Sequence, residues 1–177
     1  SYYGGGGYSL GFHFQENIGS VTNPNFSAPP TSNPYGLVSY SPALSNVGIL
    51  QWFKIIDLDN DGDFDILSNV VHQNTTQYSL NTDFLYYENT GSATNPQFST
   101  PQTNPFGLNS SPSILHTAIG DIDGDGDLDL LGFSYDYQNS TANAIFIENI
   151  GTASAPSFTT PQLNQFGMPS NVFSLIT

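Results

Sequence analysis

The chain of 177 residues carries a net charge of −14, with 15 acidic residues against a single basic residue, Lys54. This balance excludes a nucleic-acid-binding surface, which needs clustered Lys and Arg to displace counterions from phosphates, and it excludes attraction to an anionic membrane. The 14 % of aromatic residues can fill a core, while 17 glycines and 12 prolines indicate short elements joined by turns. No apolar run approaches the ~20 residues of a membrane span, so no membrane insertion is expected.

The first segment, residues 1–44, is predicted to hold the back half of a repeat unit and a connector. Residues 8–16 match the third strand of the later units, and residues 25–27 are predicted as the fourth strand. The chain begins without Met and without an apolar signal segment, so we expect a mature, processed form or a fragment.

The next two segments, residues 45–108 and 109–168, are each predicted to be a complete unit of four antiparallel strands. Apolar alternation predicts strands at 48–56, 64–71, 83–89 and 97–100, and again at 113–120, 128–134, 142–149 and 157–160. Polar stretches at 72–81 and 135–141 are predicted as turn-like connectors. The last segment, residues 169–177, contains a sequence at 170–177 that matches the first strand of a unit.

A repeat of about 60–70 residues sets this register. Glu16-Asn-Ile-Gly, Glu88-Asn-Thr-Gly and Glu148-Asn-Ile-Gly occupy one repeated position. Because the three glutamates recur at the end of the same strand, a structural role is favoured over catalysis. The whole chain is therefore predicted to be one all-β repeat domain, with two complete four-stranded blades of β-propeller type and split partial blades at both termini.

Two nine-residue stretches concentrate the negative charge. Each places Asp at positions 1, 3, 5, 7 and 9 and Gly at position 6, where a sharp turn is needed. Five carboxylates so close together repel one another unless a cation lies among them, and hard oxygen ligands at this spacing suit Ca²⁺. The predicted ligands of two calcium sites are Asp57, Asp59, Asp61, Asp63 and Asp65, and Asp121, Asp123, Asp125, Asp127 and Asp129.

The Asp-x-Asp-x-Asp-Gly-Asp-x-Asp stretches, with Tyr/Phe-x-Glu-Asn-x-Gly-Ser/Thr downstream, resemble the FG-GAP-like (VCBS-type) repeats. The resemblance implies the blades of a β-propeller, as in secreted bacterial proteins and the heads of integrin α chains. It implies calcium ligation by the side chains at positions 1, 3, 5 and 9 and by the backbone carbonyl at position 7, here Asp63 and Asp127. Propellers have four to eight blades, so this chain is not expected to close a ring alone.

An EF-hand is the competing interpretation of the acidic loops. It needs a bidentate Glu at position 12 and flanking helices, but position 12 is Ser68 or Gly132 inside a strand pattern. The EF-hand is therefore rejected.

Nothing in the sequence favours an enzyme. The three histidines, His13, His72 and His116, fall at unrelated repeat positions, and no nucleophile elbow or phosphate loop occurs. Four Asn-x-Ser/Thr sequons are candidate glycosylation sites: Asn25, Asn74, Asn109 and Asn139.

Two functions remain open. The first is an extracellular, calcium-stabilised structural protein that self-assembles head-to-tail into a filament or ring, with residues 170–177 of one copy completing the blade begun by residues 8–27 of the next. The second is a piece of a larger secreted β-propeller that acts in cell adhesion or binds a protein or glycan ligand. The setting is expected to be extracellular or at the cell surface, of bacterial type, because weak calcium modules work where Ca²⁺ is millimolar.

Overall fold

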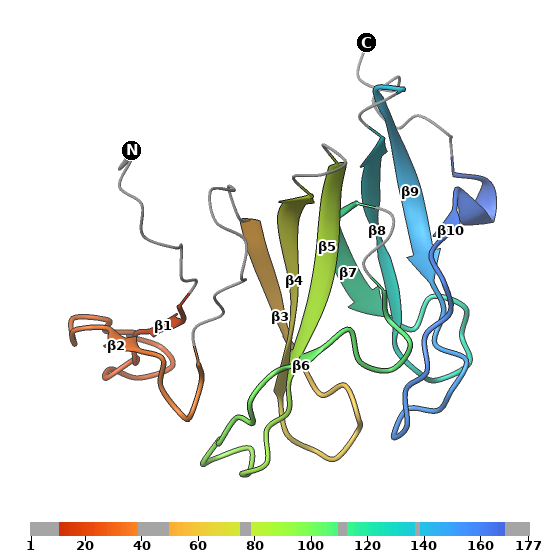
Figure 1. The fold of residues 1–177 in the computed structure, drawn as a ribbon. Coiled ribbons are helices and arrows are strands. Elements are labelled where there is room, and N and C mark those ends of the chain that lie inside the picture. Colours follow the sequence, from red (N-terminus) through yellow and green to blue (C-terminus); the bar gives the residue numbers. More distant parts are fainter. Residues whose placement is uncertain (1–10, 39–49, 75–78, 110–112, 137–138, 169–177) are drawn as a thin grey trace, which may run out of the picture.

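The computed structural model describes residues 11–38, 50–74, 79–109, 113–136 and 139–168 (Figure 1). The fold is all-β, as predicted, and the one helical element among these residues is a single 3₁₀ turn, η1 (Gln165–Gly167). No helix in the described part of the chain is long and apolar enough to cross a membrane.

The strands form three antiparallel sheets, which we call the first unit (residues 11–38), the second unit (50–109) and the third unit (113–168). The first unit pairs β1 (His13–Phe14) with β2 (Thr31–Ser32). The second unit has the order β3 (Leu50–Ile56), β4 (Asp65–Asn74), β5 (Ser79–Tyr87) and β6 (Gln102–Thr103). The third has the order β7 (Ile114–Gly120), β8 (Asp129–Asp136), β9 (Thr141–Ile147) and β10 (Gln162–Leu163).

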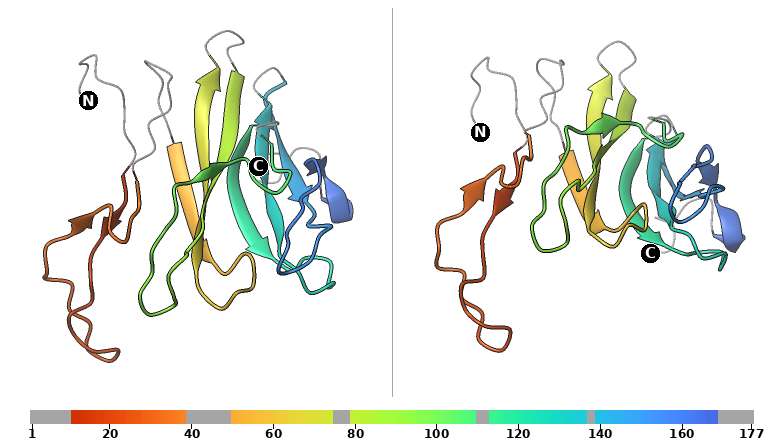
Figure 2. Two further views of the ribbon diagram at one scale, coloured as in Figure 1. Left: turned by 60° about the horizontal axis from the view of Figure 1, so that its bottom comes forward. Right: turned by 90° about the horizontal axis from the view of Figure 1, so that it is seen from below.

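Each four-stranded sheet is a meander, because every strand pairs with its neighbour in sequence. This is the connectivity predicted for the two complete units. The two larger sheets stand face to face, and the first unit lies on the opposite side of the second unit (Figures 1 and 2). The described residues therefore form a stack of three sheets and not a closed ring.

The main core lies between the second and third units. Phe84 and Tyr86 of β5 face Leu130 of β8 and Ile145 of β9, and all four are at most 2 % exposed. Burial of such large apolar side chains stabilises the stack by roughly 1.5–3 kcal/mol for each side chain.

Two polar side chains also cross this interface. The Thr82 hydroxyl accepts a hydrogen bond from the Ile114 N–H at 3.0 Å and donates one to the Ile114 carbonyl at 2.8 Å. The Asn69 side-chain amide donates to the Leu115 carbonyl at 3.0 Å. These bonds fix the offset of one sheet on the other, because each satisfies a buried polar group that would otherwise cost free energy.

A smaller core lies between the first and second units. Phe12 packs edge-on against Tyr87, with ring centroids 5.2 Å apart, and Leu37 is buried beside Leu85. In both interfaces, the earlier of the two units therefore packs the same face against the later one.

The repeated Asn-x-Gly turn is built alike in all three units. In the second unit, the Asn89 side-chain oxygen accepts hydrogen bonds from the N–H groups of Gly91 at 3.1 Å and Gln97 at 2.9 Å. The turn needs glycine at position 91, because a Cβ there would lie 2.4 Å from the Asn95 carbonyl oxygen. The sequence repeat thus marks a turn in which one amide holds two strand ends together.

Two details of the sequence prediction were wrong. The polar stretch 72–81 is largely strand, because β4 extends to Asn74 and β5 begins at Ser79. Residues 135 and 136, predicted as connector, likewise belong to β8. Polar residues at the exposed end of a long hairpin keep the ladder hydrogen bonds and need no apolar alternation.

The fourth strands also lie further downstream than predicted. The stretches 25–27, 97–100 and 157–160 are not strands; β2, β6 and β10 take that place. Phe98 and Phe158 each form only a single bridge, to Asn89 and Asn149, and point into the cores. Pro101 directly follows the stretch 97–100, and proline has no N–H group to donate to a strand-pairing hydrogen bond. Residues 8–10 and 170–177 lie outside the described residues.

Candidate metal centres

The two acidic loops occupy the same place in their sheets. The first connects β3 to β4 and the second connects β7 to β8, so each is closed at its base by strand pairing, Ile56 with Asp65 and Gly120 with Asp129. Left-handed backbone at Asn60 and Gly62, with φ of 56° and 98°, coils the first loop inward.

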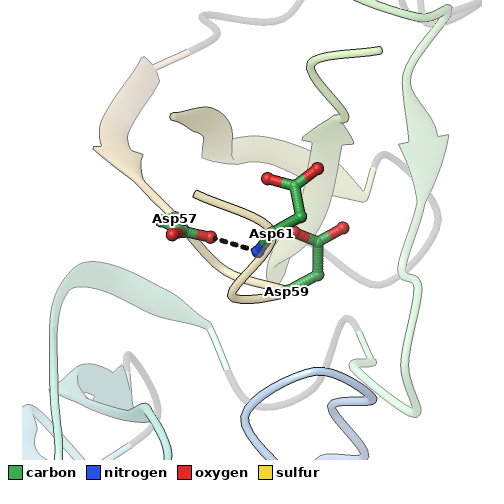
Figure 3. Close-up of side chains that lie close together, drawn as sticks. All are labelled: Asp57, Asp59 and Asp61. Carbon is green, nitrogen blue, oxygen red and sulfur yellow. Dashed lines mark hydrogen bonds between the residues drawn. The ribbon is translucent and has the colours of Figure 1, made fainter. Parts of the chain in front are cut away.

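In the first loop, the side chains at positions 1, 3 and 5 converge. Asp57, Asp59 and Asp61 each offer an oxygen within 4.8 Å of the others' oxygens (Figure 3). Asp57 also holds the backbone, because its carboxylate accepts hydrogen bonds from the N–H groups of Asp61 and Gly62, both at 3.1 Å. The loop thus holds one oxygen of each of three carboxylates within 4.8 Å of the others.

In the second loop, the side chains at positions 1, 3 and 9 converge. The oxygens of Asp121, Asp123 and Asp129 come within 4.8 Å of one another. Asp121 holds this loop as Asp57 holds the first, since its carboxylate accepts from the N–H groups of Gly124 at 2.7 Å and Gly126 at 3.2 Å. Both loops therefore use position 1 to fold the backbone and to present oxygen.

The aspartate at position 9 ties each loop to the sheet. Asp65 is 1 % exposed, and its carboxylate accepts from the N–H groups of Leu58 at 3.2 Å and Asn89 at 2.8 Å. Asp129 is fully buried and accepts from the N–H groups of Ile122 at 3.0 Å and Asn149 at 2.9 Å. Asp65 also accepts a hydrogen bond from the Tyr86 hydroxyl at 2.9 Å.

Several carboxylate oxygens are buried without any hydrogen-bond donor among the described residues. They are Oδ1 of Asp59, Oδ1 of Asp63 and Oδ1 of Asp127. A buried anionic oxygen without a donor is costly, whereas a bound cation would satisfy it. The all-oxygen donor sets and these unpartnered atoms fit a hard cation such as Ca²⁺.

The electrostatics agree with this. Burial raises the pKa of Asp59, and the neighbouring charges of Asp61 and Asp57 raise it further. Burial and the charge of Asp125 likewise raise the pKa of Asp127. Burial raises the pKa of Asp65 to about 6, although the hydrogen bonds from Asn89, Tyr86 and Leu58 oppose the shift. Each rise comes first from the burial of a carboxylate, and neighbouring negative charges add to it.

The structure brings six of the ten predicted ligands into two close trios and leaves four outside them. The four are Asp63, Asp65, Asp125 and Asp127. Of these, Asp63 and Asp127 have an unpartnered buried oxygen, and Asp65 holds the loop to the sheet.

Sequence reasoning missed three residues that support the loops. Asn89 and Asn149 donate backbone N–H groups to the position 9 carboxylates, and Tyr86 donates its hydroxyl to one of them. This Asn recurs in every copy of the Glu-Asn-x-Gly motif, and that recurrence is the signal that could have identified it. Tyr86 carried no such signal, because its counterpart in the third unit is Phe146.

The other candidate residues do not gather. Each histidine has a separate neighbour: His13 contacts Ser32, His72 lies 3.6 Å from Asp83, and the His116 ring lies tilted beside the Trp52 ring, with centroids 4.2 Å apart. Among the sequons, Asn25 and Asn139 are exposed.

Comparison with known proteins gives one family. The family model of the FG-GAP-like repeat matches residues 57–132, which run from the first acidic loop through the second and into β8. Comparison with curated proteins and with solved structures gave no match. FG-GAP-like repeats are typical of β-propeller-like adhesion or ligand-binding modules of extracellular or surface proteins, and they are generally non-enzymatic. Residues 57–132 therefore match the FG-GAP-like repeat that the two aspartate motifs predicted.

Proposed function

We propose that this protein is an extracellular structural protein whose sheets are calcium-stabilised blades of β-propeller type and which self-assembles head-to-tail into a filament or ring. The observation that carries the proposal is the unequal build of the three units. Two are four-stranded sheets with an acidic loop, whereas the described part of the first unit holds only the equivalents of the last two strands.

An apolar groove beside the first unit supports contact with a second copy. It encloses about 310 Å³ between the first unit and β3, and Phe14, Tyr35, Phe53 and Phe64 are among its lining residues. Phe53 and Phe64 are 52 % and 62 % exposed, although they are large and apolar.

The corresponding place between the second and third units is only partly filled, because about 300 Å³ stays open there beside Tyr86, Phe106 and Pro156. There Leu58 of the first acidic loop is 2 % exposed and packs in the core with Leu130, while Ile119 packs against it. In the proposed assembly, residues 170–177 of another copy occupy the groove, because their pattern matches a first strand such as β3.

Particle size tests the assembly. In 0.15 M salt and millimolar calcium, light scattering and electron microscopy of the purified chain are expected to show particles many times larger than 19.1 kDa. A chain without residues 170–177 is expected to stay small. A well-folded full chain that remains at 19.1 kDa at all concentrations would overturn the proposal.

The calcium sites are proposed at both loops. In the first, Asp57, Asp59, Asp61 and Asp65 would hold the ion together with the backbone carbonyl of Asp63. In the second, the ligands would be Asp121, Asp123, Asp125 and Asp129 with the carbonyl of Asp127. A bound Ca²⁺ supplies two positive charges and no redox chemistry, so its role in each loop is to join two strands.

Calorimetric titration of the metal-free chain with calcium tests these sites. Two bound ions per chain are expected, and one in a variant with Asp57→Asn and Asp59→Asn. Stoichiometry unchanged in that variant would contradict the first site.

The second candidate function is a module that binds a protein or glycan in adhesion, which the family match favours. It differs from assembly in its expected result: a 19.1 kDa particle that becomes larger only with a partner present.

A further inference from the structure

A turn of one aromatic residue and one glycine joins each unit to the next. In the first unit, the Tyr35 carbonyl accepts a hydrogen bond from the Phe98 N–H of the second unit at 2.8 Å. In the second unit, the Phe106 carbonyl accepts one from the Phe158 N–H of the third unit at 2.7 Å. The same backbone bond therefore forms twice within the chain.

The glycine of the turn makes the close approach possible. Gly36 and Gly107 have φ of +83° and +85°. A Cβ at Gly36 would lie 3.0 Å from the Phe98 carbonyl oxygen, and a Cβ at Gly107 would lie 2.8 Å from that of Phe158. In both copies, the next unit occupies the space that a side chain in place of the glycine would need.

The third copy of the turn has the same shape but no neighbouring unit among the described residues. Phe166 and Gly167 have φ of 56° and 74°, and the Phe166 ring packs edge-on against Phe146 at 5.0 Å. The equivalent pair in the second unit, Phe106 and Tyr86, has the same arrangement at 5.1 Å. A Cβ at Gly167 would nevertheless meet no atom of the described residues within 4 Å, and Phe166 is 62 % exposed.

The other side of this contact, the Phe turn that receives the aromatic-glycine turn, also has an uncovered copy. It lies in the first unit, at the opposite side of the stack. Phe26 of the first unit occupies the repeat position of Phe98 and Phe158. Its turn has the same frame, because the Ile18 N–H donates to the Asn25 carbonyl at 2.9 Å and the Asn17 side chain accepts from the Asn25 N–H at 2.7 Å. Phe26 is 53 % exposed, whereas Phe158 is 5 % exposed, and no described residue accepts a hydrogen bond from the Phe26 N–H.

We infer that the Phe166-Gly167 turn of one copy binds the Phe26 turn of a second copy, with the Phe26 N–H donating to the Phe166 carbonyl. The inference rests on the proposed head-to-tail assembly and names one joint in it. The occupant is a second copy because each chain carries both halves of a contact that it already makes twice internally. The two halves are different surfaces, so the contact is heterologous and extends to a ring or a filament.

Two single substitutions test the joint from its two sides. Phe26→Asp removes one half and Phe166→Asp removes the other; aspartate tolerates the left-handed backbone at position 166. Each variant alone is expected to need about 30-fold more protein than the wild type to assemble, which is the loss typical of a buried aromatic anchor.

Mixing the two variants gives the sharper result. Phe26→Asp keeps an intact Phe166 turn, and Phe166→Asp keeps an intact Phe26 turn, so one wild-type joint can form between them. The equimolar mixture is expected to give a dimer of twice 19.1 kDa and no larger particle.

Matched controls carry the same added charge at exposed positions outside the joint. Val21→Asp is the control for Phe26→Asp, because Val21 lies in the same turn region and is 98 % exposed. Ile150→Asp is the control for Phe166→Asp, because Ile150 is 63 % exposed. Both controls are expected to assemble like the wild type. Circular dichroism and calcium titration check that all four variants are folded.

The outcomes separate the two proposals. If the wild type stays monomeric, the proposed assembly is wrong. If the wild type assembles and the folded Phe26→Asp or Phe166→Asp variant assembles equally well, assembly stands and this joint is wrong.

Discussion

The two acidic loops share one motif but meet different neighbours. The first loop lies against the next sheet, where its Leu58 is 2 % exposed, while the equivalent Ile122 of the second loop is 39 % exposed. The Asp65 carboxylate accepts the Tyr86 hydroxyl, but Phe146, at the same register position of the third unit, has none to donate. The comparison teaches that two copies of one acidic motif can differ in how far they contribute to the core.

The largest expected difference concerns the aspartate at position 9. In excess calcium, Asp65→Ala leaves two N–H groups and a hydroxyl without an acceptor, so we expect it to lower the free energy of unfolding by about 3–5 kcal/mol. Asp129→Ala leaves two N–H groups without an acceptor. We expect its loss in the free energy of unfolding to be about 1 kcal/mol smaller than that of Asp65→Ala. Urea denaturation of both variants measures the difference. An equal or larger loss in Asp129→Ala would contradict the ranking.

The next comparison is between alanine substitutions of the apolar residue at position 2 of each acidic loop. Leu58→Ala opens a cavity between the two sheets and is expected to cost about 2–4 kcal/mol. Ile122→Ala, at a partly exposed site, is expected to cost about 1 kcal/mol or less when measured on dilute, unassembled protein. Thermal unfolding at fixed calcium concentration measures both. Similar losses would show that the first loop is not packed more tightly than the second.

Exchanging the aromatic residues tests the hydroxyl alone. Tyr86→Phe removes the donor to Asp65 and is expected to cost about 1–1.5 kcal/mol. Phe146→Tyr introduces a hydroxyl at the equivalent position, and we expect it to raise the free energy of unfolding by about 1 kcal/mol if the hydroxyl reaches Asp129. Urea denaturation of the single and double variants checks whether the effects are independent. A loss of stability in Phe146→Tyr would mean that the two sites differ in more than this group.

The smallest expected effect is a pH dependence centred on the first loop. Burial raises the pKa of Asp65 from 3.8 to about 6, so the metal-free fold binds a proton more tightly than the unfolded chain does. The contribution of Asp65 to stability therefore grows as the pH falls through 6 and is complete below about 4. Urea denaturation in metal-free buffer at pH 7 and pH 5 is expected to show the higher stability at pH 5.

Two controls accompany the pH measurement. Asp65→Asn is expected to reduce the dependence, because the amide does not titrate. Calcium at limiting concentration is expected to reverse the slope, because protons compete with the ion for the carboxylates. A metal-free wild type that loses stability between pH 7 and pH 5 would show that another group dominates.

The sequence predicted more of the site than of the strands around it. Aspartates at alternate positions with glycine at position 6 are a local pattern, and both loops are built by local hydrogen bonds that the carboxylates of Asp57 and Asp121 accept. The fourth strands were misplaced because Phe98 and Phe158 look like strand residues, whereas each is held by an Asn turn and points into a core. Side-chain direction in such a turn depends on the neighbouring sheet, which a single strand pattern does not encode.

By itself the sequence determined the all-β class, the repeat, the two acidic loops and the resemblance to the FG-GAP-like repeat, because these depend on spacing along the chain. The tertiary structure alone decided which copies of a repeated position are buried. Leu58 and Phe158 are covered by a neighbouring unit, whereas their equivalents Ile122 and Phe26 face outward. The reason is physical: burial is a property of what stacks on a face, and equal residues at the inside and the edge of a stack meet different surroundings.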